Sequence, residues 1–183
     1  MPPKKDLELI EDFRQGDNAG FNELVRRYQE KVYWIARRVV GSHEDADDVV
    51  QDVFIKVYEA LKEFRAASGF YTWLYRITVN ASLNALRKRR IKDFVRYEDV
   101  EETLNSDAGG ADADVLSKEY ESILEKAIER LPPRQKAVFI MRYYDEMSYE
   151  EMAQILDRSV GGLKANYFHA LKKIQVYVRK ESK

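Results

Sequence analysis

Helical periodicity runs through nearly the whole sequence, and it constrains the fold more than any other feature. In almost every long segment apolar residues recur every three to four positions, the spacing of an amphipathic helix. Only four prolines and eight glycines interrupt a chain of 183 residues. No stretch reads convincingly as a strand. We therefore predict an all-α fold.

The first half of the chain predicts one bundle-like helical domain over residues 1–96. A short helix is expected at 6–14, followed by longer ones at 21–39, 46–61 and about 70–90. Gly41 follows the first of the longer stripes, and its conformational freedom suits a helix stop. The last helix finishes on the cations "RKRR", which favour a helix C-terminus.

An acidic segment at 97–117 separates this domain from the rest. Net charge is only -1 overall, but it divides into +3 for residues 1–97, -8 for 98–121 and +4 for 122–183. The segment is rich in Asp, Ser, Asn and Gly, which is typical of a flexible, exposed linker. Whether it only keeps the protein soluble or has a specific role stays open at this point.

Residues 118–183 predict a second small helical domain that contains a helix-turn-helix. "LPPRQ" indicates a helix end, after which Pro132 or Pro133 opens the next helix. Ser148 and Glu151 have the spacing of a capping box, and Ser159 can cap the final helix after the tight turn "DRS". Two short helices joined by about three residues describe a helix-turn-helix, although any helical hairpin shares this geometry.

The final helix has an outer face that suits DNA. Its inner stripe comprises Leu163, Tyr167, Ala170, Leu171 and Ile174. The opposite side carries Lys164, Ala165, Phe168, His169 and Lys172, with Asn166 nearby. In a major groove the apolar groups would meet thymine methyls or sugars, lysines would reach phosphates, and the amide or imidazole would face base edges. The alternative is that Phe168 packs on a neighbouring helix and the lysines are only solvated.

The helix expected at 46–61 turns Asp48, Gln51, Asp52 and Ile55 outward together. Acidic groups around an outward isoleucine are typical of a docking patch for a basic partner, with the isoleucine as its apolar anchor. An ordinary solvated face with one stray apolar residue is the alternative. A metal site is a poorer interpretation, because consecutive helical carboxylates diverge instead of converging on one ion.

The helix expected at 70–90 carries a polar, basic ridge between two apolar stripes. The ridge consists of Arg76, Asn80, Asn84 and Arg87, beside Trp73. Before it lies the loop "EFRAASGFYTW", with Arg65 and several aromatic residues, which could hold an unstacked base. Core packing is the alternative for Trp73 and Phe70, and we favour it for both.

Composition excludes several classes of function. Cysteine is absent and only two histidines occur, so disulfides, thiol catalysis and structural zinc are not expected. No signal peptide or membrane span is evident, so a cytoplasmic protein without membrane insertion is expected. No nucleophile motif or phosphate-cradling glycine loop is present, and no catalytic residue, metal or cofactor is predicted.

Three stretches, in this order and spacing, resemble one family closely. They are "FNELVRRYQEKVYWIARRVVGSHEDADDVVQDVFIKVYEAL", "FYTWLYRITVNASLNALRKRR" and "LPPRQKAVFIMRYYDEMSYEEMAQILDRSVGGLKANYFHALKKI". They resemble the bacterial extracytoplasmic-function (ECF) sigma factors of the sigma-70 family. Such proteins are not enzymes but subunits that direct RNA polymerase to promoters and assist promoter melting. The resemblance implies a region 2 domain at 1–96, the linker at 97–117 and a region 4 domain at 118–183.

The resemblance also implies partners and site residues. The β′ clamp helices of the polymerase would bind Asp45, Asp48, Gln51, Asp52 and Ile55. The minus-ten element would contact Phe64, Arg65, Ser68, Tyr75, Arg76, Asn80, Asn84 and Arg87. The minus-thirty-five element would contact Lys164, Ala165, Asn166, Phe168, His169 and Lys172. The polymerase β flap and an anti-sigma factor are further expected partners, and the acidic linker would run through the RNA path of the polymerase.

One departure and two rival interpretations remain. The final helix reads "GGLKANYFHA" where family members commonly carry "GTVKSRLHRA", so fewer fixed cations imply a different base preference and a smaller salt dependence. A helix-turn-helix regulator that acts without polymerase is the main rival, usually as a dimer on paired half-sites. A helical hydrolase is the second, although no paired acid and base support it.

Overall fold

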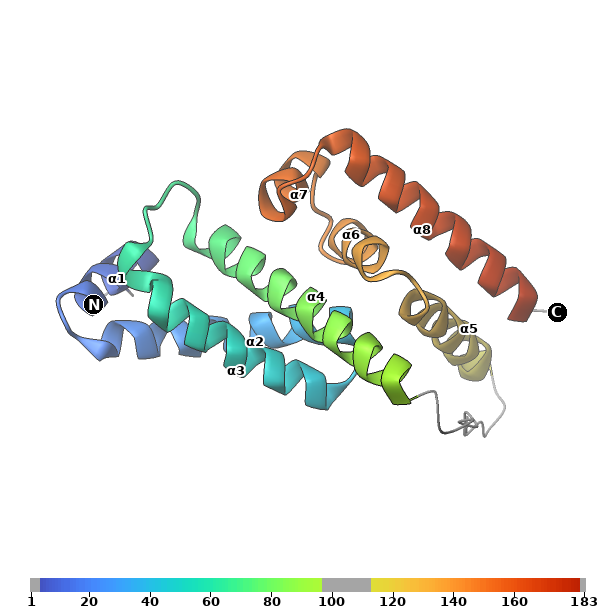
Figure 1. Ribbon diagram of the computed structural model, residues 1–183, viewed down its shortest axis with the longest axis horizontal. Coiled ribbons are helices and arrows are strands. Elements are labelled where there is room, and N and C mark those ends of the chain that lie inside the picture. Colours follow the sequence, from blue (N-terminus) through green and yellow to red (C-terminus); the bar gives the residue numbers. More distant parts are fainter. Residues whose placement is uncertain (1–3, 97–112, 182–183) are drawn as a thin grey trace. The chain divides into compact units, whose positions relative to one another are not determined.

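The computed structural model describes residues 4–96 and 113–181, and within these ranges it is helical (Figure 1). Its regular elements there are eight α-helices and one short 3-10 helix, with no strand. The chain divides into two compact units, the first built mainly on α1 to α4 and the second mainly on α5 to α8. The all-α fold predicted from periodicity is confirmed.

The first unit contains the four helices that the sequence predicts. They are α1 (Asp6–Arg14), α2 (Asn18–Val40), α3 (His43–Ala60) and α4 (Phe70–Arg96), with the 3-10 helix η1 (Leu61–Glu63) after α3. In Figure 1 the three longer helices lie alongside one another, and α1 packs against α2 and η1. Helix α4 continues past the expected end near residue 90.

Local signals fix the ends of these helices. Asp17 caps α2, because its carboxylate accepts a hydrogen bond from the Ala19 amide at 2.9 Å. Gly41 ends α2 in the left-handed conformation, with φ of 90°. Ser42 then caps α3 by accepting from the amide of Asp45 at 3.1 Å. The turn between the two longest predicted stripes is thus encoded by adjacent residues.

The core of the first unit is aliphatic along α2 and α3 and aromatic near the start of α4. Buried residues of α2 and α3 include Leu24, Val32, Ile35, Ala36, Val39, Val49, Val53 and Val57. The ring of Phe70 in α4 meets the ring of Tyr28 in α2 edge to face, with 5.4 Å between the ring centroids. This packing fixes the start of α4, and with it the preceding loop.

The second unit contains α5 (Ala113–Glu129), α6 (Pro133–Tyr143), α7 (Tyr149–Leu156) and α8 (Val160–Glu181). Pro133 opens α6, as predicted, with Pro132 in the preceding cap position. Helix α8 packs against both α5 and α6. A buried cluster in the core of this unit comprises Ala127, Ile128, Leu131, Phe139, Ala170 and Ile174.

The expected acidic linker at 97–117 falls largely outside the described residues, which resume at 113. Helix α5 begins at Ala113, earlier than the start expected near Lys118. Helix α8 is also longer than the short recognition helix expected from the sequence, since it continues to Glu181. Its last turn carries Arg179 and Lys180, cations that favour a helix C-terminus.

Candidate nucleic-acid interface

The outer face of α3 carries four of the five residues predicted to bind polymerase. Asp48, Gln51 and Asp52 are exposed, and Ile55 is 58 % exposed. Asp45 is placed differently. Its carboxylate accepts a hydrogen bond from the Ser42 hydroxyl at 2.7 Å, so it belongs to the capped start of α3.

The loop at 64–69 begins with a buried aromatic residue. Phe64 is 6 % exposed, and its ring lies 5.1 Å from Trp73 and 6.0 Å from Phe70. Phe70 is itself buried, whereas Trp73 keeps part of its surface exposed. Phe64 was predicted to contact DNA, but its ring packs in the core and is not presented at the surface.

The rest of the loop is accessible. Arg65 is exposed and Ser68 is partly exposed. Ala66 has a φ of 52°, a left-handed conformation that costs a non-glycine residue roughly 1 kcal/mol or more. A short loop with one strained residue, an exposed guanidinium and a hydroxyl lies directly before α4.

The polar ridge on α4 is present, with one correction. Asn80, Asn84 and Arg87 are exposed and Arg76 is partly exposed. Tyr75 is only 1 % exposed, so its predicted contact with DNA does not fit its placement. The phenol lies in the second apolar stripe of α4, which the sequence had already placed beside the ridge.

Two buried hydroxyls on α4 escaped the sequence analysis. Thr78 and Ser82 are fully buried, and each donates to a carbonyl of the preceding turn, Leu74 at 2.9 Å and Thr78 at 2.8 Å. These bonds satisfy the hydroxyls within the helix, so α4 can bury polar residues at no cost in unpaired groups. The signal available was their position inside an apolar stripe.

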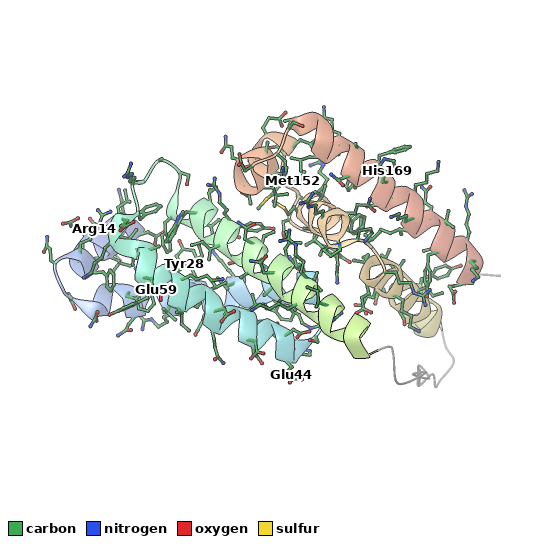
Figure 2. All side chains as sticks on the ribbon, in the orientation of Figure 1. Arg14, Tyr28, Glu44, Glu59, Met152 and His169 are labelled. Carbon is green, nitrogen blue, oxygen red and sulfur yellow. The ribbon has the colours of Figure 1, made fainter. Side chains whose placement is uncertain are left out.

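The outer face of α8 matches the helical wheel drawn from the sequence. Lys164, Ala165, His169 and Lys172 are exposed, and Phe168 is 61 % exposed. Figure 2 shows His169 on this helix. Because Phe168 has most of its surface exposed, its alternative role as a packed core residue is not supported.

Asn166 is held differently from its neighbours on α8. It is partly buried, and its side-chain amide donates to the carbonyl of Gly162 at 2.9 Å. This bond uses one of the two N–H donors of the side-chain amide, so the second N–H and the side-chain carbonyl oxygen remain for other partners. The residue lies in the second turn of α8, which begins at Val160.

The turn between α7 and α8 is fixed by the capping residues predicted from the sequence. Ser148 and Glu151 exchange bonds, with the Glu151 amide donating to the Ser148 hydroxyl at 3.2 Å and the Ser148 amide to the Glu151 carboxylate at 2.8 Å. The Ser148 hydroxyl also donates to the Glu151 carboxylate at 2.7 Å, and this bond, together with the one from the Ser148 amide, lowers the pKa of Glu151 below its usual range. The Ser159 hydroxyl accepts from the Gly162 amide at 3.2 Å and caps α8.

An aromatic ring at the start of α7 links three helices, and the sequence analysis missed it. Arg142 of α6 and Lys164 of α8 lie over the ring of Tyr149, at 5.6 and 5.5 Å from its centroid. Tyr167 of α8 meets the same ring edge to face at 6.4 Å. Cations favour this position over an aromatic face, so Tyr149 helps to place Lys164.

Polar contacts also anchor α1 to α2. The Tyr28 hydroxyl donates to the Asp6 carboxylate at 2.5 Å, and the Arg27 guanidinium lies 3.3 Å from the same carboxylate. Burial, assisted by the Asp6 carboxylate, raises the pKa of Tyr28 to about 12. Arg27 also holds Glu23 at 2.8 Å and lowers the pKa of that carboxyl group.

Two absences bear on the chemistry, both among the described residues. No group of three or more histidine or carboxylate side chains there is placed to hold a metal ion. None of the helices in that part of the chain has an apolar stretch sufficient to span a bilayer.

Comparison with known proteins gives the class of protein first. Residues 24–91 match the protein family Sigma-70 region 2, and residues 121–174 match the family Sigma-70, region 4. In fold the chain is similar to CnrH, solved in complex with the cytosolic domain of CnrY, with a TM-score of 0.63, 22 % identity and coverage of 96 % of this chain and 97 % of that one. It is equally similar in TM-score, 0.63, to the sigma factor RpoE of Bartonella quintana, solved with the anti-sigma factor NepR, at 22 % identity over 87 % of this chain and 96 % of that one.

Curated relatives then define the family. The ECF RNA polymerase sigma-E factor of Escherichia coli strain K12 is 39 % identical over 186 residues, covering 96 % of this chain and 97 % of the relative. The protein of the same name from Haemophilus influenzae is 39 % identical over 177 residues, covering 93 % of each chain. The chain therefore belongs to the ECF RNA polymerase sigma factors, as its sequence motifs indicated. The rival interpretation as a regulator without sigma activity is not favoured.

Proposed function

We propose that this chain joins bacterial RNA polymerase core through the outer face of α3 and directs it to promoters through two separate DNA-binding surfaces. The observation that carries the proposal is the exposed acidic face of α3, with Ile55 at 58 % exposure among Asp48, Gln51 and Asp52. An exposed apolar anchor within an acidic rim suits a basic helical partner, here the β′ clamp helices. Asp45 supports this face by accepting a hydrogen bond from Ser42, the residue that caps α3.

The first DNA surface comprises the loop at 64–69 and the ridge of α4. The minus-ten element would be bound by exposed and partly exposed polar groups of this surface. The exposed ones are Arg65, Asn80, Asn84 and Arg87, and the partly exposed ones are Ser68 and Arg76. Cations hold the backbone, and the loop would receive an unstacked base, whose extrusion costs a few kcal/mol that stacking largely returns. Phe64 and Tyr75 support this surface from the core. Promoter melting would then draw on base-binding free energy.

The second DNA surface is the outer face of α8, which would enter the major groove of the minus-thirty-five element. Lys164 and Lys172 would meet phosphates. Ala165 and Phe168 are suited to thymine methyls and sugars, while Asn166 and His169 would face base edges. Domains at 1–96 and 118–183, joined by the acidic segment at 97–117, follow from this division of roles.

Further partners belong to the same proposal. One fold relative was solved with an anti-sigma factor, and an inhibitor of that kind, covering the polymerase- and DNA-binding faces, is proposed here too. The β flap would bind the second unit. The acidic segment, which lies outside the described residues, would occupy the RNA path of the polymerase as a mimic of RNA phosphates. The chain would act in the cytoplasm as an initiation factor and not as an enzyme.

Run-off transcription with purified core polymerase tests the proposal. Start-site-specific RNA is expected only when the chain is added. Asp48→Arg and Asp52→Arg, tested singly, should each weaken core binding about tenfold, because each places a cation against a basic partner. Glu30→Arg makes the same charge change on the exposed side of α2 and should leave core binding unchanged.

Two outcomes would reject this function. Specific DNA binding by the chain alone, as a dimer and without any gain from core polymerase, would favour the helix-turn-helix regulator. Equal loss of core binding in Glu30→Arg and Asp52→Arg would show a general charge effect and no docking face on α3.

A further inference from the structure

The last residue of α1 reaches across the sequence to the start of the loop at 64–69. The Arg14 Nε donates to the carbonyl of Lys62 at 3.1 Å, and its Nη2 donates to the carbonyl of Phe64. The two ends of these bonds are 48 and 50 residues apart. Figure 2 shows Arg14 where α1 ends. One guanidinium thus binds two backbone carbonyls at the point where η1 becomes the loop.

These two carbonyls need a partner. Carbonyls at the end of a helix have no amide of the next turn to accept from, and here the chain leaves η1 for an extended conformation at Phe64. A planar guanidinium presents several N–H groups in a fixed fork, so it can satisfy two acceptors at once. A lysine ammonium at the same position lacks that fork.

The bonds fix the direction in which the loop starts. Phe64 has its ring in the core against Trp73 and its carbonyl on Arg14, so both its side chain and its backbone are held. Arg65, the next residue, is exposed. Ala66 then takes the left-handed conformation, which persists only where surrounding contacts hold it.

Helix α1 is itself firmly placed, so Arg14 acts from a rigid support. A Cβ atom at Gly20 of α2 would lie 2.2 Å from the Leu9 carbonyl oxygen, which shows how closely the two helices approach. Leu9, Ile10 and Phe13 are buried. The bond between Tyr28 and Asp6 holds the other end of α1.

We infer that Arg14 is a positioning residue for base recognition by the loop at 64–69. It shapes the loop through its backbone and does not contact nucleic acid. This inference rests on the proposed role of the loop in binding an unstacked base. It assigns to α1 a part in selecting the base, in addition to packing.

The test uses the full chain bound to core polymerase and a pair of single-stranded DNA oligonucleotides. The pair differs at one base, chosen by selection with the wild-type complex. Arg14→Lys keeps the charge but loses the fork. Arg26→Lys is the matched control, since the Arg26 side chain is 76 % exposed and pairs with Glu23, one turn earlier in the same helix. Affinity is measured for both oligonucleotides over a range of salt concentrations.

Arg14→Lys should reduce the preference for the matched base about tenfold, which is the worth of one charge-assisted hydrogen bond. The salt dependence of binding should not change. In Arg14→Ala, which removes the charge, loss of a direct contact with phosphate would instead lower the slope of log K against log salt by roughly 0.7 for a single strand. Arg26→Lys should change neither quantity.

Arg14→Ala with added guanidinium gives a second measurement that does not depend on the lysine variant folding. Sub-denaturing guanidinium should restore base preference, whereas urea at equal concentration should not. Unchanged base preference in Arg14→Lys, or a lower salt slope in Arg14→Ala with base preference intact, would overturn the inference. Arg65→Ala and Ser68→Ala distinguish failure of this inference from failure of the proposed role of the loop. If these two variants also leave base preference unchanged, the proposed role of the loop fails as well.

Discussion

The two candidate DNA surfaces are built in opposite ways. The outer face of α8 comes from one continuous helix, and its inner stripe, including Leu163 and Ala170, is buried in the second unit. The loop at 64–69 depends on α1, η1 and α4 together, through Arg14 and the aromatic contacts of Phe64. A surface on one helix is set by local periodicity, whereas a surface on a loop is set by contacts that are distant in sequence.

Replacing the buried ring of Phe64 should have the largest effect on stability. A small effect would contradict the contrast between the two surfaces. Phe64→Ala removes a core ring that contacts Phe70 and Trp73, so it should lower the free energy of unfolding by about 3–5 kcal/mol. Chemical denaturation of the full chain measures this value. A loss below about 1 kcal/mol would mean that the loop is not anchored by this ring.

Gly20→Ala should have the next largest effect. The added methyl group would meet the Leu9 carbonyl oxygen at 2.2 Å, so α1 must move, at a cost of about 1–3 kcal/mol. Gly161→Ala is the matched control, because nothing lies within 4 Å of its Cβ position, and it should be neutral or stabilising by up to about 1 kcal/mol. Thermal unfolding of both variants checks the sign. Equal behaviour would show that α1 is not a tight support.

Ser148→Ala should cost about 1 kcal/mol by removing the cap of α7. The pKa of Glu151 is lower in the folded protein than the ordinary value of 4.5. Its contribution to stability is therefore fully present above the unfolded pKa and is lost as pH falls through the lower, folded pKa. The difference in the free energy of unfolding between wild type and Ser148→Ala should therefore become smaller in acid. Chemical denaturation between neutral pH and pH ~3 would measure it. A gap that widened on acidification would contradict the bond geometry.

Phe168→Ala should have the smallest effect on stability and a clear one on binding. The ring is 61 % exposed, so its loss should change the free energy of unfolding by less than about 0.5 kcal/mol. Binding of the holoenzyme to promoter DNA should fall about tenfold, because the ring loses its contact with the groove. Gel-shift titration measures the affinity. Unchanged affinity would remove Phe168 from the proposed surface.

Sequence periodicity predicted the helices and the outer face of α8 well. The capping residues Ser148 and Ser159, the stop at Gly41 and the start at Pro133 are local signals, and each is found in the structure. The exposed set on α3 (Asp48, Gln51, Asp52 and Ile55) followed from the same periodicity, whereas Asp45 was implied only by the family resemblance. Such features depend on neighbours within one or two turns, which the sequence displays directly.

Contacts between distant segments were not predictable in this way. Phe64 carries no local mark that separates a buried ring from one that meets a base, and its burial was settled by tertiary packing, whereas Tyr75 lay in an apolar stripe that already favoured burial. The sequence assigned no role to Arg14 or Tyr149. Their roles come from partners that lie elsewhere in the sequence.

Helix α8 serves the core and the outer face with alternate sides of the same turns. Ala170 is completely buried one residue after the exposed His169. A larger side chain at position 170 would shift or rotate helix α8 in the second unit. The exposed side chains of its outer face would be reoriented with it. If α8 binds the promoter as proposed, its base preference would change through such interior replacements, with no change in any side chain of its outer face.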